Sequence, residues 1–573
     1  MGLRYLTAAS AACLVASLSA AGAGTSPVAD AAMKGDRARL RVLLQQKADV
    51  NAPQADGATA IEWAAYRNDL EMADLLIAAG ANVKLANRDG VTPLWLASEN
   101  GSARMIGKLI EAGADPNERQ PNGETPLMMA ARNGNLAALK FLLDHRANVN
   151  LKEDLRGTTA LMWAAEQMHA DAVKLLVERG AEVAAATAPD TRNSRLNIAP
   201  TVQQRIAQDV AFGTRRPRRP TPGAAEDTAD AADDFAAFYR LPQVKDGGGL
   251  TPLVYAAREG CLECARTLLD AAANVNQVTN YGWSALLTAT QNRHYQLAAY
   301  LLSRGANPNL PNKGGWTPLY LATDNRNIES GDYPVRKPDM DDLDFIKLLI
   351  EKGATVNARI CGIESSDQAC KGDTTETRTN FTMQWLYEDG ATPFLRAAQS
   401  GDLNLMKLML AHGADPKIAT AHNDTALAVA SGIGWVEGIT FEWSPEESVE
   451  AVKMCLDLGI DPDAANKDGR TALHGAAHKG RNAVVQTLVD RGAKLDAHDN
   501  GSRDTFTGAL FGHTWEPVDY ARGLVRVGVQ SAIAHPDTES LLEKLMKERG
   551  IPVPLPTNQT ICVTDLCRGK PQE

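Results

Sequence analysis

Apolar and polar residues follow one another along this 573-residue chain in short helical blocks separated by glycines. In one block, Thr92 is suited to cap a helix N-terminus, and Pro93 is suited to its first turn, where a missing N–H costs nothing. Ala97 falls on the apolar face of that helix, and Gly101 ends it. A second apolar block ends at Gly113, which is suited to a left-handed C-cap. The pattern predicts two short helices between Pro93 and Gly113.

The same block returns at a fixed period. Thr59, Thr92 and Thr125 stand 33 residues apart (92 − 59 and 125 − 92), and each is followed by an apolar helix start and by small residues at the same offsets. An abbreviated copy at 28–51 precedes the clear ones, and a degenerate copy at 515–550 follows them. The threonine or serine marker is recognisable at Thr59, Thr92, Thr125, Thr159, Thr251, Ser284, Thr317, Thr392, Thr425 and Thr471.

A period of 33 that carries Thr-Pro-Leu-x-x-Ala resembles the ankyrin-repeat family, of the exported bacterial type, over most of the chain. The resemblance implies an α-solenoid of about twelve helix–turn–helix units, joined by β-hairpin-like fingers and broken by insertions. Because a single unit lacks a sufficient core, the units must stabilise one another by stacking. The resemblance further implies a protein that binds another protein through its finger tips and the first helices of its repeats.

The first 23 residues are typical of a cleavable signal peptide. Arg4 is followed by an uncharged stretch rich in Ala, Leu and Ser that ends in Ala21-Gly22-Ala23. An uncleaved anchor is the alternative. We therefore expect a periplasmic or secreted protein with no membrane attachment after cleavage, and a monomer. The net charge of −11 argues against nucleic-acid binding, because phosphates require a basic surface.

Departures from the period predict the domain organisation. The insertion at 184–248 carries the basic run 215–220 and an acidic run at 226–234, so we expect it to be partly disordered. A basic latch for an acidic partner is the alternative interpretation. The predicted segments are a signal peptide at 1–23, repeats at 24–183, an insertion at 184–248, repeats at 249–357, an insertion at 358–388, repeats at 389–555 and a tail at 556–573.

The cysteines fit an oxidising compartment. Two pairs lie close together in the sequence and predict local disulfides that hold poorly supported segments: Cys361 with Cys370 and Cys562 with Cys567. A third close pair, Cys261 with Cys264, is interpreted as a structural disulfide or as buried thiols. The last pair forms a Cys-x-x-Cys motif, so thiol-redox chemistry is an alternative to a structural role, although the motif lacks a βαβ setting. Cys455 is interpreted as a buried apolar residue.

Candidate partner-binding residues come from the fingers and the first helices. Trp283 and Trp316 precede the marker in consecutive repeats and are expected at exposed turns, where tryptophan is common in binding hot spots; packing between fingers is the alternative. The further candidates are Trp63, Trp163 and Tyr255 at the fifth position of the motif, and Tyr66, Arg132, Glu166 and Arg258 after the paired small residues.

No zinc-protease motif, P-loop, nucleophile elbow or dinucleotide fingerprint occurs in the sequence. We therefore expect no catalytic residues, no metal site and no cofactor. The sequence predicts a non-catalytic scaffold for protein–protein interaction in the periplasm. The resemblance allows a narrower role, in which the protein assists a periplasmic redox or peroxide-detoxifying enzyme.

Overall fold

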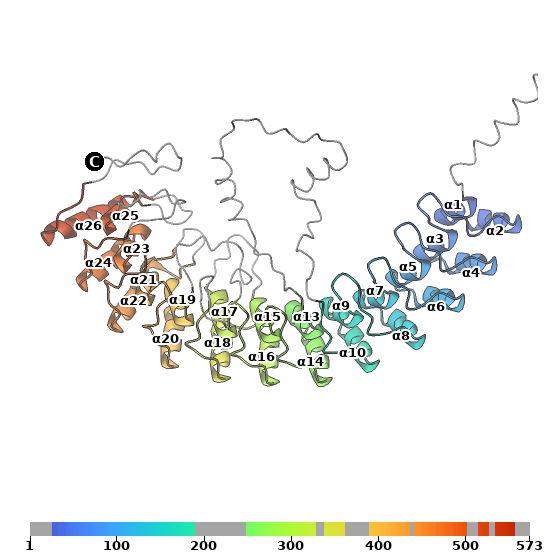
Figure 1. Ribbon diagram of the computed structural model, residues 1–573, viewed down its shortest axis with the longest axis horizontal. Coiled ribbons are helices and arrows are strands. Elements are labelled where there is room, and N and C mark those ends of the chain that lie inside the picture. Colours follow the sequence, from blue (N-terminus) through green and yellow to red (C-terminus); the bar gives the residue numbers. More distant parts are fainter. Residues whose placement is uncertain are drawn as a thin grey trace, which may run out of the picture. The chain divides into compact units, whose positions relative to one another are not determined.

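The computed structural model describes residues 26–188, 248–327, 337–360, 389–435, 441–500, 514–525 and 533–555. Within these ranges it contains 24 α-helices and no strand, and the helices follow one another as pairs (Figure 1). The predicted repeat α-solenoid is therefore confirmed. The described residues belong to two compact units: unit 1 holds 26–188 and 248–274, and unit 2 begins at residue 275.

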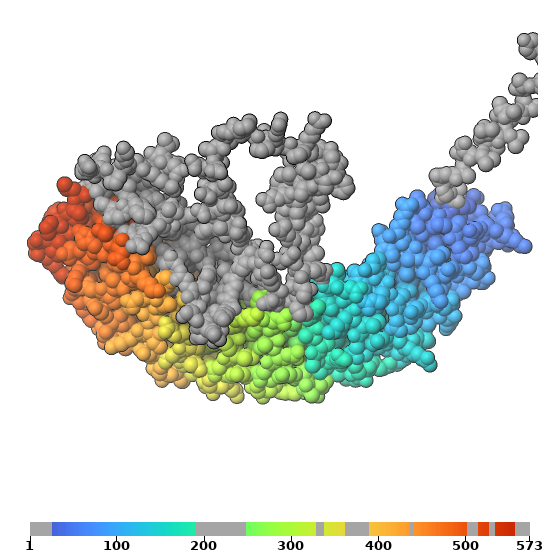
Figure 2. Space-filling view, viewed as in Figure 1, coloured from blue at the N-terminus to red at the C-terminus, as the bar shows by residue number. Residues whose placement is uncertain are grey.

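Unit 1 is a stack of helix pairs in which first helices pack on first helices and second helices on second helices. The space-filling view shows its consecutive repeats in contact (Figure 2). The first helices are α1 (Pro27–Lys34), α3 (Ala60–Tyr66), α5 (Pro93–Glu99), α7 (Pro126–Arg132), α9 (Ala160–Glu166) and α13 (Pro252–Glu259). The second helices are α2 (Arg37–Gln45), α4 (Leu70–Ala78), α6 (Ala103–Glu111), α8 (Leu136–Asp144), α10 (Ala170–Glu178) and α14 (Leu262–Asp270).

Unit 2 repeats this arrangement. Its first helices are α15 (Ala285–Gln291), α17 (Pro318–Arg326), α19 (Pro393–Gln399), α21 (Ala426–Ser431), α23 (Ala472–Lys479) and α25 (Pro517–Ala521). Its second helices are α16 (Tyr295–Ser303), α18 (Asp342–Glu351), α20 (Leu403–Ala411), α22 (Pro445–Asp457), α24 (Asn482–Asp490) and α26 (Pro536–Glu548).

The caps form as the sequence predicts. The Thr92 hydroxyl accepts a hydrogen bond from the backbone N–H of Trp95 at 3.2 Å, with Pro93 in the first turn of α5. After the second helix, Gly305 adopts a φ of 88°. Nothing lies within 4 Å of the position that its Cβ would take, so glycine is favoured there by its backbone conformation alone. Arg146 takes the equivalent position in its repeat at a φ of 70°.

The fingers are joined to one another by backbone hydrogen bonds. In unit 1 the N–H of Arg88 donates to the carbonyl of Asp56 at 2.9 Å. Thr187, near the start of the predicted insertion at 184–248, exchanges backbone bonds with Leu250 and Gly249, which directly follow its end. In unit 2, Ile360, near the start of the predicted insertion at 358–388, bonds in the same way to Ala391, which follows its end. Both insertions therefore leave and re-enter the stack through one closed finger, which preserves the register of the repeats.

An asparagine after the second helix links many repeats to the next. The Asn117 side chain donates to the carbonyl of Arg146 at 3.1 Å and accepts from the N–H of Asn148 at 2.6 Å. Both bonds tie one loop to its neighbour through a single amide group. The same pair of bonds is made by Asn51, Asn150, Asn276, Asn309 and Asn357.

In one repeat, Lys84 occupies the position of this asparagine, 33 residues after Asn51 (84 − 51). We expect Lys84→Asn to raise the free energy of unfolding of unit 1 by about 1 kcal/mol, because it adds two bonds, to Gly113 and Asp115. Urea unfolding measures this gain. The matched change Asn117→Lys is expected to lose a similar amount, and a Lys84→Asn variant without added stability would contradict the register assigned to the loops.

Several predictions fall on residues outside the described ranges. These are the signal peptide at 1–23, the tail at 556–573, and nearly all of the insertions at 184–248 and 358–388. The predicted disulfides between Cys361 and Cys370 and between Cys562 and Cys567 lie outside them as well. Cys455 is described, and it is a buried free thiol as predicted.

Candidate functional site

On the first helices α3, α5, α7, α9 and α13 of unit 1, the residue that follows a pair of small residues is exposed or half-buried. The paired small residues before it, such as Ala64 and Ala65 on α3, are fully buried and let neighbouring helices approach. The next residue along the helix turns about 100° away from them and emerges at the surface. We call the resulting row the first-helix strip. It consists of these residues, Tyr66, Glu99, Arg132, Glu166 and Arg258, together with Trp163, whose ring lies beneath Arg132.

At one end of the strip, two aromatic rings meet on α3. Tyr66 is 59% exposed and stands edge-on to Trp63, with ring centroids 5.7 Å apart. The half-buried Trp63 donates through Nε1 to Oε1 of Gln54 at 2.6 Å, and Gln54 in turn donates to Asp30. These bonds fix the indole and leave the Tyr66 ring as the accessible member of the pair.

In the middle of the strip, Arg132 of α7 lies over the ring of Trp163 of α9, with its guanidinium carbon 4.9 Å from the ring centroid. Arg132 is exposed and Trp163 is half-buried. Among the described residues, no carboxylate lies within ion-pair distance of Arg132. A cation over an indole is stabilised by the ring's quadrupole, while the N–H edges of the guanidinium stay available to a ligand.

Toward the other end, Glu166 and Arg258 connect α9 to α13. Nη2 of Arg258 donates to Oε1 of Glu166 at 2.6 Å, and its Nε donates to Glu259 at 2.7 Å. The guanidinium carbon also lies 4.9 Å from the centroid of the Tyr255 ring. The segment at 189–247 separates these helices in sequence, yet α13 packs directly on α9. Five candidates named from the sequence, Arg132, Trp163, Glu166, Tyr255 and Arg258, thus lie on three successive first helices.

One expectation about exposure is wrong, and one further candidate is buried. Trp316 is 4% exposed and stands edge-on to Tyr320 with ring centroids 4.9 Å apart, because its side chain folds back onto the helix that follows the finger. Tyr255 is likewise 4% exposed, and burial raises the pKa of its hydroxyl. Neither ring offers a contact surface. Trp283 is half-buried at its finger, where its backbone pairs with Thr279.

Sequence reasoning missed a buried polar network in unit 2. Arg326 of α17 donates to Asp402 at 2.7 Å, and Arg396 of α19 donates to Asp324 at 2.7 Å. The Arg326 guanidinium also lies over the ring of Trp443, at 4.4 Å from its centroid. The signal available in the sequence was Arg396, which occupies the fifth position of the motif where Trp63 and Trp163 stand in other repeats.

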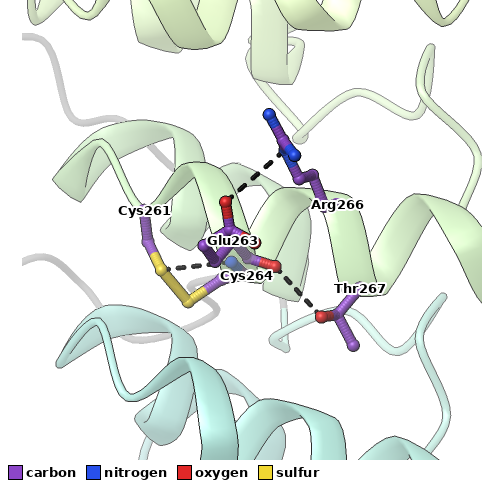
Figure 3. The surroundings of a disulfide bond; sticks show 5 residues. All are labelled: Cys261, Glu263, Cys264, Arg266 and Thr267. Atoms are coloured by element: carbon purple, nitrogen blue, oxygen red, sulfur yellow. Dashed lines mark hydrogen bonds and ion pairs between the residues drawn. A yellow bond between two sulfur atoms is a disulfide. The ribbon is translucent and has the colours of Figure 1, made fainter.

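Cys261 and Cys264 are joined by a disulfide at the start of α14 (Figure 3). Cys261 is the N-cap residue, and its sulfur accepts from the N–H of Cys264 at 3.2 Å. Cys261 is 8% exposed and Cys264 is fully buried. Glu263 and Arg266 form an ion pair at 3.6 Å on the exposed side of the same turn. At this position the disulfide can hold the first turn of α14 in place. Because both sulfur atoms belong to buried residues, attack on the disulfide by another thiol is restricted.

Two structural features are absent from the described residues. No cluster of His, Cys, Asp or Glu side chains there has the arrangement of a metal site. None of the described helices is both long and apolar enough to cross a membrane.

Unit 1 contains one buried and one half-buried carboxyl group whose pKa values are raised. Burial raises the pKa of Glu62 and of Glu118 from an ordinary value of 4.5 to about 7. Thr59 donates to Glu62 at 3.3 Å, and Thr92 donates to Glu118, which opposes the rise only in part. At a pH between 4.5 and about 7, the folded chain therefore keeps protons at these two sites that the unfolded chain has released.

The contribution of these protons to stability is fully present below pH 4.5 and is lost as the pH rises through about 7. We therefore expect the temperature at which half of unit 1 is unfolded to decrease as the pH is raised from about 5 to about 8. The double variant Glu62→Gln/Glu118→Gln is expected to flatten this dependence, as followed by circular dichroism. A midpoint that rises over this range, or the same slope in the double variant, would contradict the assignment.

Comparison with known proteins extends these observations. One model of ankyrin repeats matches residues 28–120, 94–187, 232–312 and 274–360, which together make up more than half of the chain. Further ankyrin-repeat models match residues 445–505 and 389–421. The family models therefore cover most of the described helix pairs, while α21, α25 and α26 lie outside the matched residues.

Curated proteins resemble shorter stretches. Serine/threonine-protein kinase 12 of Arabidopsis thaliana is 41% identical over 66 residues, which are 12% of this chain and 14% of that protein. Ankyrin repeat and SOCS box protein 16 of Mus musculus is 28% identical over 154 residues, 26% of this chain and 32% of that protein. A palmitoyltransferase of Lachancea kluyveri is 32% identical over 117 residues, 20% of this chain and 14% of that protein. The chain thus spans less than a third of each of these relatives.

Proposed function

Because the chain belongs to the ankyrin-repeat family, we propose that it is a non-catalytic scaffold that binds another protein through the first-helix strip of unit 1. The observation that carries the proposal is the stack of Arg132 on Trp163, exposed and without a carboxylate partner among the described residues. Tryptophan and arginine are the residues most enriched in binding hot spots, and here one orients the other before any partner arrives. A scaffold uses such a surface without any catalytic group.

The proposal is tested by capturing partners from the source cells on the purified full chain and on the variant Arg132→Ala/Trp163→Ala. A partner that uses the strip is retained by the wild-type chain and lost from the variant. The matched control is Lys174→Ala, which removes an exposed cation from the second helix α10. Partners that are retained equally by all three chains would overturn the proposal.

We further propose that the protein acts as a monomer outside the cytoplasm. Arg4 and the uncharged stretch to Ala23 support export, and the cysteine pairs suit an oxidising compartment. Mass spectrometry of the mature protein gives its N-terminus, which this proposal expects near Gly24. An intact Met1 on a cytoplasmic protein would overturn it.

A second candidate function is thiol-redox chemistry at Cys261 and Cys264, favoured by their position at the start of α14. Their burial argues for the structural role instead. We expect a structural disulfide to resist dithiothreitol in the folded chain and to react only when urea unfolds unit 1, as measured by counting free thiols. Rapid reduction of the folded chain, with turnover of a disulfide substrate, would favour the redox function. The narrower role beside a redox or peroxide-detoxifying enzyme is decided by the identity of the captured partner.

A further inference from the structure

The first-helix strip contains two opposite charges that have no ion-pair partner among the described residues. Glu99 at the end of α5 and Arg132 at the end of α7 are exposed, and within the part of the chain that the structure describes neither forms an ion pair. The equivalent residues on the next two first helices, Glu166 and Arg258, are paired with each other at 2.6 Å. On the preceding helix α3, the equivalent residue is the exposed Tyr66. From α3 to α7 the strip therefore offers an aromatic ring, a carboxylate and a guanidinium, and neither charged group pairs with a described residue.

The spacing of these groups follows from helix packing. Neighbouring packed helices have axes about 8–10 Å apart, so equivalent side chains on α3, α5 and α7 are separated by steps of that size. A polyproline II segment has three residues per turn and a rise of about 3.1 Å per residue. Every third side chain of such a segment therefore returns to the same side after about 9 Å, which matches the step between the helices.

The width of the strip also favours a narrow ligand. Each of these first helices exposes a single side chain at this position, and the paired small residues beside it are buried. An α-helix with its side chains is about 10–12 Å wide, and it brings equivalent side chains to one side at this spacing only every seventh residue. An extended ribbon makes the same three contacts with a much shorter segment.

We propose that the first-helix strip binds a polyproline II segment of the partner protein, with a different chemical group at every third residue. An apolar side chain lies on Tyr66, a lysine or arginine meets Glu99, and an aspartate or glutamate meets Arg132. This inference rests on the proposed function and adds the chemistry of the partner. The anchor is Arg132, because its stack on Trp163 fixes the plane of the guanidinium and directs two N–H groups toward a carboxylate.

The inference is tested with four capped peptides that proline holds in the polyproline II conformation. Two carry the proposed order, Leu-Pro-Pro-Lys-Pro-Pro-Glu and its reverse, since the direction of the bound chain is open. The other two exchange Lys and Glu and keep the composition. We expect one peptide of the first pair to bind the full chain about ten-fold more tightly than either control, in a titration followed by tryptophan fluorescence at low salt.

A second and more stringent experiment exchanges the two charged residues of the protein. Glu99→Arg/Arg132→Glu alters only exposed side chains, so circular dichroism is expected to match the wild-type chain, and the preference among the peptides is expected to reverse. Equal affinity for all four peptides, binding of none at millimolar concentration, or a preference that does not reverse would overturn the inference. The proposed function would still stand if the captured partner is lost from Arg132→Ala/Trp163→Ala while these peptides fail, and both would fall if that partner is retained.

Discussion

The variant Asp402→Asn is expected to lower the free energy of unfolding of unit 2 by about 3–5 kcal/mol, because it leaves a buried arginine without its carboxylate. Arg326 and Asp402 are 9% and 2% exposed, and the Nε–Oδ2 distance is 2.7 Å. Asp402 also caps α20 by accepting from the N–H of Leu405 at 3.2 Å, a bond that asparagine can keep. The expected loss therefore comes from the charge. Hydrogen exchange of the α17 and α20 amides, together with urea unfolding, measures it.

Two control variants isolate the buried charge. Arg326→Met/Asp402→Asn removes the stranded cation and is expected to recover part of the loss. Asp344→Asn breaks an ion pair to Lys347 at 3.1 Å whose side chains are 65% and 49% exposed, and it is expected to cost at most about 1 kcal/mol. If Asp402→Asn costs no more than Asp344→Asn, the network does not hold α17 against α20.

Trp163→Ala is expected to weaken binding of the partner by about 2 kcal/mol or more, roughly a 30-fold loss of affinity. Without the indole, Arg132 loses the surface that orients it, and the partner loses a large apolar contact. Isothermal titration with the captured partner measures the change, and Trp163→Phe is expected to retain part of the affinity because a ring remains beneath the guanidinium.

The matched control is Trp95→Ala, which removes a half-buried indole of α5 that is not part of the strip. It is expected to lower the thermal midpoint of unit 1 and to leave the affinity nearly unchanged. If Trp163→Ala lowers the midpoint in the same way and the partner binds normally, Trp163 contributes only to packing.

The repeat architecture could be predicted because its signals are local. Thr92, Pro93 and Gly113 each act on the backbone within a few residues, and the period of 33 places every further copy. The first-helix strip could be predicted in part for the same reason, since Arg132, Glu166 and Arg258 follow paired small residues in register. That Arg258 pairs with Glu166 across the segment at 189–247 followed only from the position of α13 on α9.

Contacts between distant segments explain what the sequence did not reveal. Trp316 was expected at an exposed turn, because its position in the finger gives no sign that the indole packs on Tyr320. The buried pair of Arg326 and Asp402 joins residues 76 positions apart, and predicting it required knowing that α17 and α19 are neighbours despite the segments between them. Side-chain burial in a solenoid depends on which repeats adjoin, and the period alone does not give this.

The most direct test of the central claim is hydrogen–deuterium exchange on the full chain with and without its captured partner. If the first-helix strip of unit 1 is the binding surface, amides at the ends of α3, α5, α7 and α9 are expected to exchange more slowly in the complex, and those of α4, α6, α8 and α10 to remain unchanged. Protection confined to the second helices or to unit 2 would contradict the account.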